Sequence, residues 1–313
     1  MTTIRQQTQK IFFALGTVNT LTVWDSVDET VLNRAKQCVL SLHNRLSAFD
    51  NHSEIGQINA CAGKKPVTVS PDTLHLIEQS VRYAEQTEGL FDITIRPLSA
   101  LWKASIRQKR LPDSKTIATQ AALTDYRDIL IDHANHTVML RQEGQSIDLG
   151  AIAKGYAADA VRHILLEEGI QEAVINLGGT VVTLGKTRRI GLQHPLAPTG
   201  TPFGYLRLQQ KAVVTSGLYE QGFFLNGYCY HHIIHPHTGY PTDSELLGVT
   251  LIGEQAEQLD ALSTCAFMLG VERSLDLLQP YSIEAVFVTK DGQIYTTEAL
   301  RHQLILIGKE VQP

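Results

Sequence analysis

The chain has 313 residues, of which 43% are apolar and 19% charged, and its formal net charge is −5. This composition is typical of a folded globular protein and excludes a largely disordered chain. No basic run exceeds a few residues, so nucleic acid is not the expected partner, and no stretch approaches the roughly 20 apolar residues of a membrane-spanning helix.

The N-terminal residues and the cysteines bear on where the protein works. Five apolar residues, 11–15, follow the polar start, and this is too short for the hydrophobic region of a signal peptide. The four cysteines are widely spaced and form no C-x-x-C pair, which favours thiols in a reducing compartment over a disulfide framework. We therefore expect a cytoplasmic protein without a membrane span.

In the first half of the chain, apolar spacing and turn residues predict alternating strands and helices. Ser53 and Ser70 are suited to cap helices, because a small hydroxyl satisfies backbone donors at a helix start. Asp92 and Thr94 are expected on one side of a strand. The predicted elements, in order, are a strand over 11–25, a helix over 28–46, a short helical turn after Ser53, a helix from Ser70 to near Gly89, and a strand within 89–98.

The second half is predicted to be richer in strands. Its expected elements are a strand at 146–148, a helix over about 150–168, a strand at 173–176, a strand-rich region to about 252, a helix from about 257, a shorter helix over 271–278, and strands at 284–289 and 303–307. Strands and helices alternate irregularly, which predicts an α+β fold of mixed sheets with flanking helices. No repeat or linker divides the sequence, so a single unit over 1–313 is expected.

The stretch from Asp148 to Asp159 combines small residues with charged ones at a predicted strand-to-helix junction. Small residues allow a ligand to approach the backbone closely. Asp148 has the position of a helix cap, which would be a purely structural role. Capping does not account for Lys154, because a lysine beside a helix N-terminus is suited to bind phosphate oxygens.

Asp260 and Thr264 are four residues apart in a predicted helix, so their side chains lie on one face. A carboxylate and a hydroxyl are hard oxygen ligands of the kind that magnesium prefers. The alternative is local: Asp260 would favour the helix N-terminus electrostatically, and Thr264 would hydrogen bond to its own backbone. The pair by itself leaves both interpretations open.

Residues 231–237 contain four histidines, which raises the question of a zinc site. Their spacing does not match tetrahedral zinc sites, and no cysteine pair accompanies them. In a strand, His231 and His235 would share one face while His232 and Ile234 would share the other. Zinc is therefore not the favoured interpretation.

Taken together, these stretches resemble the ApbE family of FAD:protein FMN transferases. The resemblance extends from Ser47 to about Gly270, and its motifs occur in the family's order. The matching stretches are Ser47–Phe49, Ser53–Ile55, Asn59, Gly89–Pro97, Asp148–Asp159, Asn176–Gly179, Thr215–Tyr219, His232–Gly239 and Asp260–Thr264.

The resemblance implies that FAD binds in a cleft between two lobes, with Mg²⁺ bridging its pyrophosphate. The metal ligands would be the main-chain oxygen of Ala151 and the side chains of Asp260 and Thr264. His232 would be the general base, and Lys154 would offset phosphoryl charge. The family positions that contact FAD correspond to Asp148, Lys154, Leu90, Phe91, Asp92 and Ile234, with Leu15 and Phe49 assigned from position alone.

The reaction implied by the resemblance transfers FMN to a threonine of an acceptor flavoprotein and releases AMP. The acceptor threonine would lie in a Ser/Thr-Gly-Ala-Thr-like motif. A magnesium-dependent FAD pyrophosphatase, with water as the nucleophile, would use the same residues, and a flavin-binding protein without turnover is a further alternative. One residue departs from the family pattern: His235 stands where the family usually has aspartate, and this change could weaken or shift activity.

Overall fold

The computed structural model describes residues 7–198, 200–218, 222–225 and 228–307. The chain divides into two compact units that interleave in sequence. Unit 1 contains Met1–Ser41, Lys154–Tyr219 and Glu245–Pro313, and unit 2 contains Leu42–Ala153 and Glu220–Ser244. Within the described residues, no helix is long and apolar enough to cross a membrane. That 1–313 acts as a single functional unit stays a prediction.

Unit 1 is built on an eight-stranded sheet in which neighbouring strands are antiparallel. The strand order is β1-β2-β6-β7-β10-β13-β14-β15. The strands are β1 Thr8–Ala14, β2 Thr17–Val23, β6 Ala173–Leu177, β7 Thr180–Leu184, β10 Ala212–Gly217, β13 Leu246–Gly253, β14 Glu284–Thr289 and β15 Ile294–Thr296.

The first predicted strand, 11–25, is wrong in one respect, because the chain reverses within it. Leu15 and Gly16 form the two-residue turn between β1 and β2, with φ of 52° and 74°. Two consecutive positive φ values match the right-handed twist of a tight hairpin. β-prone residues stand on both sides of Leu15 and Gly16, so the whole segment was predicted as one strand.

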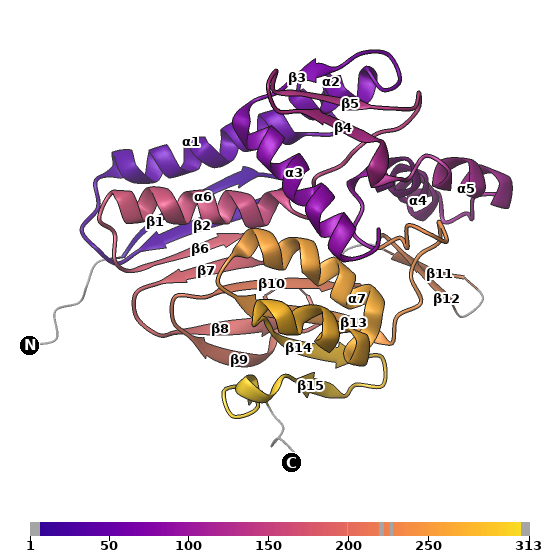
Figure 1. Cartoon of the computed structure of the whole chain (residues 1–313). Coiled ribbons are helices and arrows are strands. Elements are labelled where there is room, and N and C mark those ends of the chain that lie inside the picture. The colour runs from indigo at the N-terminus through magenta and orange to yellow at the C-terminus, as the bar shows by residue number, and fades with distance from the viewer. Residues whose placement is uncertain (1–6, 199, 219–221, 226–227, 308–313) are drawn as a thin grey trace, which may run out of the picture. The chain divides into compact units, whose positions relative to one another are not determined.

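Helices cover one face of this sheet. Figure 1 shows α6 (Ala153–Glu167), α7 (Ala256–Leu278) and the part of α1 (Glu29–Leu46) that belongs to unit 1 lying over it. The helix interior changes direction at Gly270, whose φ of 78° and ψ of −171° are not helical. The predicted long helix followed by a shorter one over 271–278 is thereby confirmed.

A second sheet packs against the other face of the large sheet. It contains β8 (Arg188–Gln193), β9 (Pro202–Leu208) and β16 (Ile305–Leu306) in the order β16-β9-β8. A cluster of buried side chains joins the two sheets, and apolar burial of this kind is the main stabilising contribution to such packing. The cluster consists of Ile190, Leu192, Leu206, Leu208, Val213, Ile252, Val286, Leu300 and Leu304.

Unit 2 combines short helices with two small sheets, ordered β3-β5-β4 and β11-β12. Its helices are α2 Glu54–Ala60, α3 Pro71–Gln86, η1 Ile93–Ile95, α4 Arg96–Gln108, α5 Ser114–Ala121 and η2 Tyr126–Asp128. Its strands are β3 Val67–Thr68, β4 Ile129–Asp132, β5 Thr137–Leu140, β11 Gly222–Leu225 and β12 Tyr228–His231. One part of its core packs Leu98, Trp102, Ile117 and Ile234 together.

Two local predictions in unit 2 need correction. Residues 89–98 do not form a strand, because Asp92 accepts a hydrogen bond from the N–H of Thr94 and starts the 3-10 turn η1, which continues into α4. Residues 146–148 are also not in a strand. Ser53 caps α2 as predicted, but the Ser70 hydroxyl donates to Glu54 instead of capping α3.

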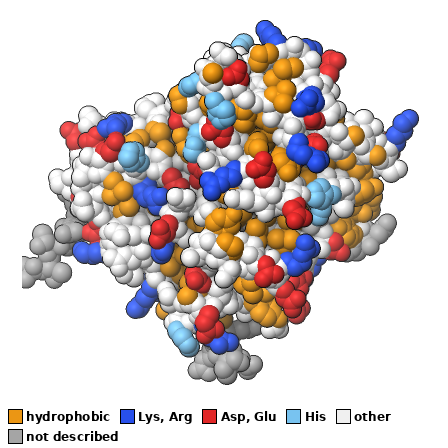
Figure 2. Space-filling view, in the orientation of Figure 1, with side chains coloured by type: hydrophobic (Ala, Val, Ile, Leu, Met, Phe, Trp, Pro, Cys, Tyr) orange, Lys and Arg blue, Asp and Glu red, His pale blue; other side chains and the backbone are white. Residues whose placement is uncertain are grey.

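The α+β architecture predicted from the sequence is confirmed, since helices flank separate antiparallel sheets within each of the two units. On the surface shown in Figure 2, acidic and basic side chains are interspersed and neither sign forms a continuous block. That nucleic acid is not the partner stays a prediction.

Candidate functional site

Asp260 and Thr264 lie on consecutive turns of α7, as their spacing predicted. The Asp260 side chain is buried, with 6% of its surface exposed, and Thr264 is half-buried. A buried carboxylate is costly unless hydrogen bonds or charges compensate it. The partners of Asp260 therefore show what this carboxylate is arranged to do.

Those partners come from the first turn of α6. The main-chain N–H of Gly155 donates to Asp260 Oδ2 over 2.9 Å, and Lys154 Nζ lies 3.7 Å from Asp260 Oδ1. The structure thus brings together two of the predicted site residues, Lys154 and Asp260. The hydrogen bond between Gly155 and Asp260 joins residues that are 105 positions apart in the sequence. Oδ2 of Asp260 accepts the hydrogen bond from the Gly155 N–H, and Oδ1 lies beside the ammonium group of Lys154.

Gly155 is required at this position by the closeness of the two helices. A Cβ atom at residue 155 would lie 2.2 Å from the carbonyl oxygen of Ala256, in the first turn of α7. Such a contact with backbone cannot be relieved by moving a side chain. The absence of a side chain at 155 therefore allows the amide of α6 to reach the carboxylate on α7.

A chain of hydroxyl groups connects α7 to β10 on the sheet below it. Ser263 Oγ donates to the carbonyl oxygen of Asp260 over 2.9 Å and lies 2.8 Å from Ser216 Oγ. Ser216 belongs to the Thr215–Tyr219 motif, whose last residue, Tyr219, lies outside the described residues. Two motifs far apart in the sequence are thereby joined beside Asp260.

The donor set fits a divalent metal ion. Asp260 Oδ1 and the Thr264 hydroxyl are hard oxygen donors on one helix face, and the Lys154 Nζ lies 3.7 Å from Oδ1. Magnesium is commonly held by one or two carboxylates with substrate phosphates completing its shell. Within the described residues, no group of three or more His, Cys, Asp or Glu side chains is arranged to hold a metal.

Asp148 and Ala151 lie in unit 2, in the loop that precedes α6. Asp148 Oδ1 accepts from the N–H of Gly150 over 2.8 Å. Because α6 begins at Ala153, Asp148 forms a turn five residues earlier and does not cap the helix. Asn59 holds this loop: its amide group donates to the Ile147 carbonyl and accepts from the Ile147 N–H.

Asp92 is buried in unit 2 and both of its carboxylate oxygens are engaged. Oδ1 accepts from the N–H and the hydroxyl of Thr94, and Oδ2 accepts from the N–H of Tyr126. Burial raises the pKa of Asp92 to about 6, against the lowering effect of these hydrogen bonds. This carboxylate holds two turns together, and its predicted contact with FAD stays a prediction.

Leu90 and Phe91 precede Asp92 and differ in exposure. Phe91 is buried edge-on against Tyr83, with ring centroids 6.2 Å apart, and Leu90 is half-buried. The packing of Phe91 anchors the segment, so that Leu90 is the side chain of this pair with surface to offer a ligand.

The histidines of 231–237 have different environments. His231 is buried: its Nδ1 accepts from the N–H of Ile233, which leaves Nε2 to donate to the carbonyl of Thr242. His232 follows the end of β12 and is half-exposed. The strand ends at His231, so the predicted alternation of side chains through Ile234 and His235 is wrong. Exposure suits His232, and not His231, for exchange of a proton with a substrate.

Ile234, Phe49 and Leu15 complete the predicted set. Ile234 is 5% exposed and belongs to the cluster around Trp102. Phe49 is 74% exposed, and the cationic groups of Arg96 and Lys103 lie 5.5 Å and 5.1 Å from its ring centroid. An exposed ring next to two cationic groups is suited to contact a planar anionic ligand. Leu15 is in the β1–β2 turn.

By unit, the predicted residues separate into two groups. Lys154, Asp260, Thr264 and Leu15 belong to unit 1. Unit 2 contains Asp148, Ala151, Leu90, Phe91, Asp92, His232, Ile234 and Phe49. The cleft expected from the family resemblance stays a prediction. No individual role was predicted for Gly155, Ser263 or Asn59, although all three lie in stretches that match the family.

Comparison with known proteins identifies the family. A family model described as the ApbE family matches residues 15–287. An FAD:protein FMN transferase of Klebsiella pneumoniae is 38% identical over 277 residues, covering 88% of this chain and 87% of that protein. One of Treponema pallidum is 31% identical over 268 residues, covering 80% and 74%. The crystal structure of the ApbE protein of Thermotoga maritima superposes with a TM-score of 0.86 at 31% identity, covering 95% of this chain and 99% of that one. The chain belongs to the ApbE family.

Proposed function

We propose that this enzyme is an FAD:protein FMN transferase that moves the FMN moiety of FAD onto a threonine hydroxyl of an acceptor flavoprotein and releases AMP. Membership of the ApbE family supports this, as does the name that the relatives from Klebsiella pneumoniae and Treponema pallidum share. The structural observation that carries the proposal is the buried Asp260 carboxylate beside Lys154, at the point where α6 begins.

Lys154 and the start of α6 have the properties of a phosphate-binding element. A helix N-terminus presents a positive dipole end to an anion, and Lys154 adds a full positive charge for the phosphoryl oxygens. We assign Lys154 to the pyrophosphate of FAD, where it offsets the negative charge that grows during phosphoryl transfer. Asp148 and Leu90 are proposed to contact FAD from their own loops.

Asp260, Thr264 and the main-chain oxygen of Ala151 are the residues that we propose to hold Mg²⁺. When bound, the ion would neutralise charge on the pyrophosphate. Asp260 has the buried, amide-oriented carboxylate that a fixed ligand requires. Thr264 adds a neutral oxygen from the next turn of the same helix.

In the proposed reaction, the acceptor threonine Oγ forms a bond to the phosphorus on the FMN side of FAD. The bond from that phosphorus to the bridging oxygen breaks, and AMP leaves with this oxygen. His232 takes the proton of the threonine hydroxyl, for which its half-exposed ring is accessible. The product is a phosphoester between FMN and the protein, so the modification is a covalent flavinylation.

The test is to incubate the purified protein with FAD and Mg²⁺, with and without a flavoprotein domain that carries a Ser/Thr-Gly-Ala-Thr-like motif. Mass spectrometry follows the domain, and chromatography follows the nucleotides. We expect a mass gain equal to an FMN group and release of AMP only when the domain is present. Formation of AMP and free FMN in both tubes would instead establish a pyrophosphatase, and FAD unchanged in both would contradict any turnover.

Two variants sharpen this test. Asp260→Ala is expected to abolish magnesium-dependent transfer, and a fully active variant would remove Asp260 from the metal site. A domain whose motif threonine is replaced by valine is expected to gain no mass, because it lacks the attacking hydroxyl. The cytoplasmic location expected from the sequence stays a prediction.

A further inference from the structure

The N-termini of α6 and α7 are capped by each other's carboxylates. The first-turn amide of Gly155 in α6 donates to Asp260 Oδ2 on α7, over 2.9 Å. In return, the first-turn amide of Glu257 in α7 donates to Asp159 Oδ2 on α6, over 3.0 Å. Amides in the first turn have no partner within their own helix. Each helix therefore depends on a side chain of the other to satisfy its N-terminus.

Asp159 has this role because α7 has no cap of its own. The residue at the N-cap position, Gln255, makes no capping hydrogen bond with its side chain. Serine, threonine, aspartate and asparagine are the side chains that ordinarily cap from that position. Asp159 supplies the missing carboxylate from a separate helix, 98 positions away in the sequence from the amide that it binds.

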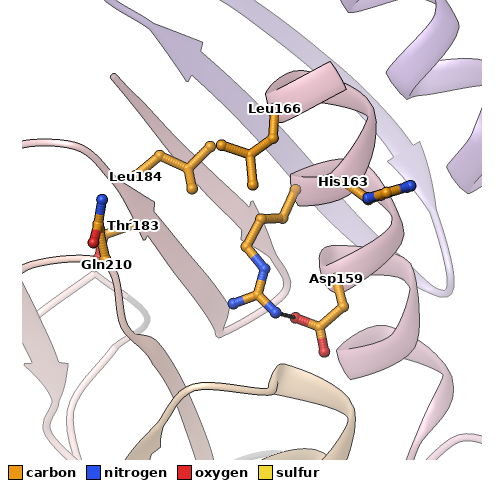
Figure 3. Close-up of a pocket in the computed structure, with 7 residues that line it drawn as sticks. Asp159, His163, Leu166, Thr183, Leu184 and Gln210 are labelled. Carbon is orange, nitrogen blue, oxygen red and sulfur yellow. Dashed lines mark ion pairs between the residues drawn. The ribbon is translucent and has the colours of Figure 1, made fainter. Parts of the chain in front are cut away.

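Arg162, one turn after Asp159, forms an ion pair with this carboxylate. Its Nη2 lies 2.9 Å from Asp159 Oδ1, and its Nη1 donates to the carbonyl of Glu254, just before α7 begins. In Figure 3, the dashed line at Asp159 marks this ion pair. One guanidinium thus joins the capping carboxylate to the segment that leads into α7.

The contact at Gly155 makes the geometry sensitive to any movement of α7. With 2.2 Å between a hypothetical Cβ and the Ala256 carbonyl, the backbones of the two helices meet there. Asp260 lies one turn beyond Ala256, so a shift of the first turn of α7 moves its carboxylate relative to Lys154 and the Gly155 amide. The cap at Asp159 holds that first turn in place.

We propose that Asp159 is a positioning residue for the metal ligand Asp260, which it orients by capping the N-terminus of α7. The inference rests on the proposed function, because it takes Asp260 as a ligand of Mg²⁺. Groups that orient a metal ligand without touching the metal typically change metal affinity about ten- to hundredfold when removed. Removing the Asp159 carboxylate should therefore lower metal affinity by about that factor.

The surroundings of Asp159 allow it to be shortened. Asp159 and Arg162 line a cavity of about 490 Å³ together with His163, Leu166, Thr183, Leu184 and Gln210 (Figure 3). Space of this size beside the carboxylate admits water, which can replace part of the lost hydrogen bonding. Asp159→Asn retains an acceptor for the Glu257 amide and removes only the charge, so it provides a milder second variant.

The experiment measures Mn²⁺ binding to the full chain in the presence of FAD, by the electron paramagnetic resonance signal of unbound Mn²⁺. A sample with FAD alone gives the background. We expect Asp159→Ala to weaken Mn²⁺ binding about ten- to hundredfold, with Asp159→Asn between it and the wild type. Transfer of FMN by Asp159→Ala should recover to within about threefold of wild type at saturating Mg²⁺.

Asp113→Ala is the matched control, because Asp113 also caps a helix, α5, through the N–H of Thr116. Its Mn²⁺ affinity should equal that of the wild type. If Asp159→Ala binds Mn²⁺ as tightly as the wild type while its melting temperature falls, Asp159 is only a helix cap and the positioning role is overturned. If Asp260→Ala also binds Mn²⁺ normally, the metal assignment itself fails, which distinguishes the two proposals.

Discussion

The main-chain N–H of Tyr126 donates to Oδ2 of Asp92 over 2.9 Å, so that η1 and η2, two turns of unit 2, share one buried carboxylate. Asp92 is 8% exposed. Burial raises its pKa to about 6, whereas an aspartate in an unfolded chain has a pKa of about 3.9. The folded protein therefore keeps a proton on Asp92 over a pH range in which the unfolded chain has lost it.

The sign of the resulting pH dependence follows from this difference. The contribution of Asp92 to the free energy of unfolding is fully present below about pH 4 and is lost as pH rises through about 6. Two pH units correspond to about 3 kcal/mol at 1.36 kcal/mol per unit. Asp92→Asn cannot ionise, so the stability of wild type relative to this variant should fall by about 2–3 kcal/mol from pH 4 to pH 8.

Urea unfolding of both proteins across this pH range tests the prediction. Replacing an oxygen by an NH₂ group beside the donors of Thr94 and Tyr126 adds an offset that does not depend on pH. Only the slope of the difference is therefore diagnostic. Parallel stability curves for the two proteins would show that Asp92 titrates normally in the folded state.

The contact between α6 and α7 predicts that Gly155→Ala is poorly tolerated. The added Cβ would be 2.2 Å from the Ala256 carbonyl oxygen, so the helices must separate, and overpacking of this kind costs about 1–3 kcal/mol. Separation also takes the amide of residue 155 away from Asp260. We expect a lower free energy of unfolding and weaker Mn²⁺ binding, measured on the same preparation.

Gly248→Ala provides the control for this substitution. Its Cβ would meet the nearest heavy atom, the carbonyl oxygen of Ser216, at 3.5 Å, which is ordinary van der Waals contact. The two variants make the same chemical change on backbones of unit 1. Equal stability and equal Mn²⁺ affinity in both would contradict the close approach of α6 to α7.

The neighbouring histidines 231 and 232 should give opposite phenotypes. His232→Ala removes the proposed base, so FMN transfer should slow about a hundredfold or more, with FAD affinity retained. His231→Ala removes a buried ring that bridges Ile233 and Thr242, so its main effect should be a loss of about 1–3 kcal/mol of stability.

Single-turnover transfer rates, FAD titrations and denaturant unfolding of both variants separate these roles. Loss of FAD binding by His232→Ala, with a normal rate per bound FAD, would argue against its assignment as the base. A stable His231→Ala variant with slow transfer would indicate that the two roles are exchanged.

Phe49 provides a test of the FAD contacts in unit 2. Its ring is 74% exposed next to Arg96 and Lys103, so its removal should leave stability nearly unchanged. If it stacks on a ring of FAD, Phe49→Ala should weaken FAD binding about five- to tenfold, in the range of about 0.5–1.5 kcal/mol for aromatic pairs.

Phe13→Ala is the comparison, because Phe13 is 64% exposed on β1 and is not part of the proposed site. Isothermal titration with FAD should distinguish the two phenylalanines. The same FAD affinity in wild type and Phe49→Ala would exclude Phe49 from the binding site.

The sequence by itself determined the elements that depend on neighbouring residues. Apolar spacing predicted α1 and α7, the position of Ser53 predicted the cap of α2, and the order of motifs indicated the ApbE family. Each of these features depends on residue types at nearby positions, and such patterns can be recognised without knowledge of the fold. The presence of Asp260 and Thr264 on one helix face is of this kind.

Only the tertiary structure decided which groups meet. The pairing of Gly155 with Asp260 spans 105 positions and that of Glu257 with Asp159 spans 98, and no local pattern encodes contacts over such separations. Likewise, Asp92 starts a 3-10 turn and not a strand, because its oxygens bind the amides of Thr94 and Tyr126. The reason is that a buried backbone N–H without a partner in its own element donates to whichever suitable oxygen the fold brings within reach.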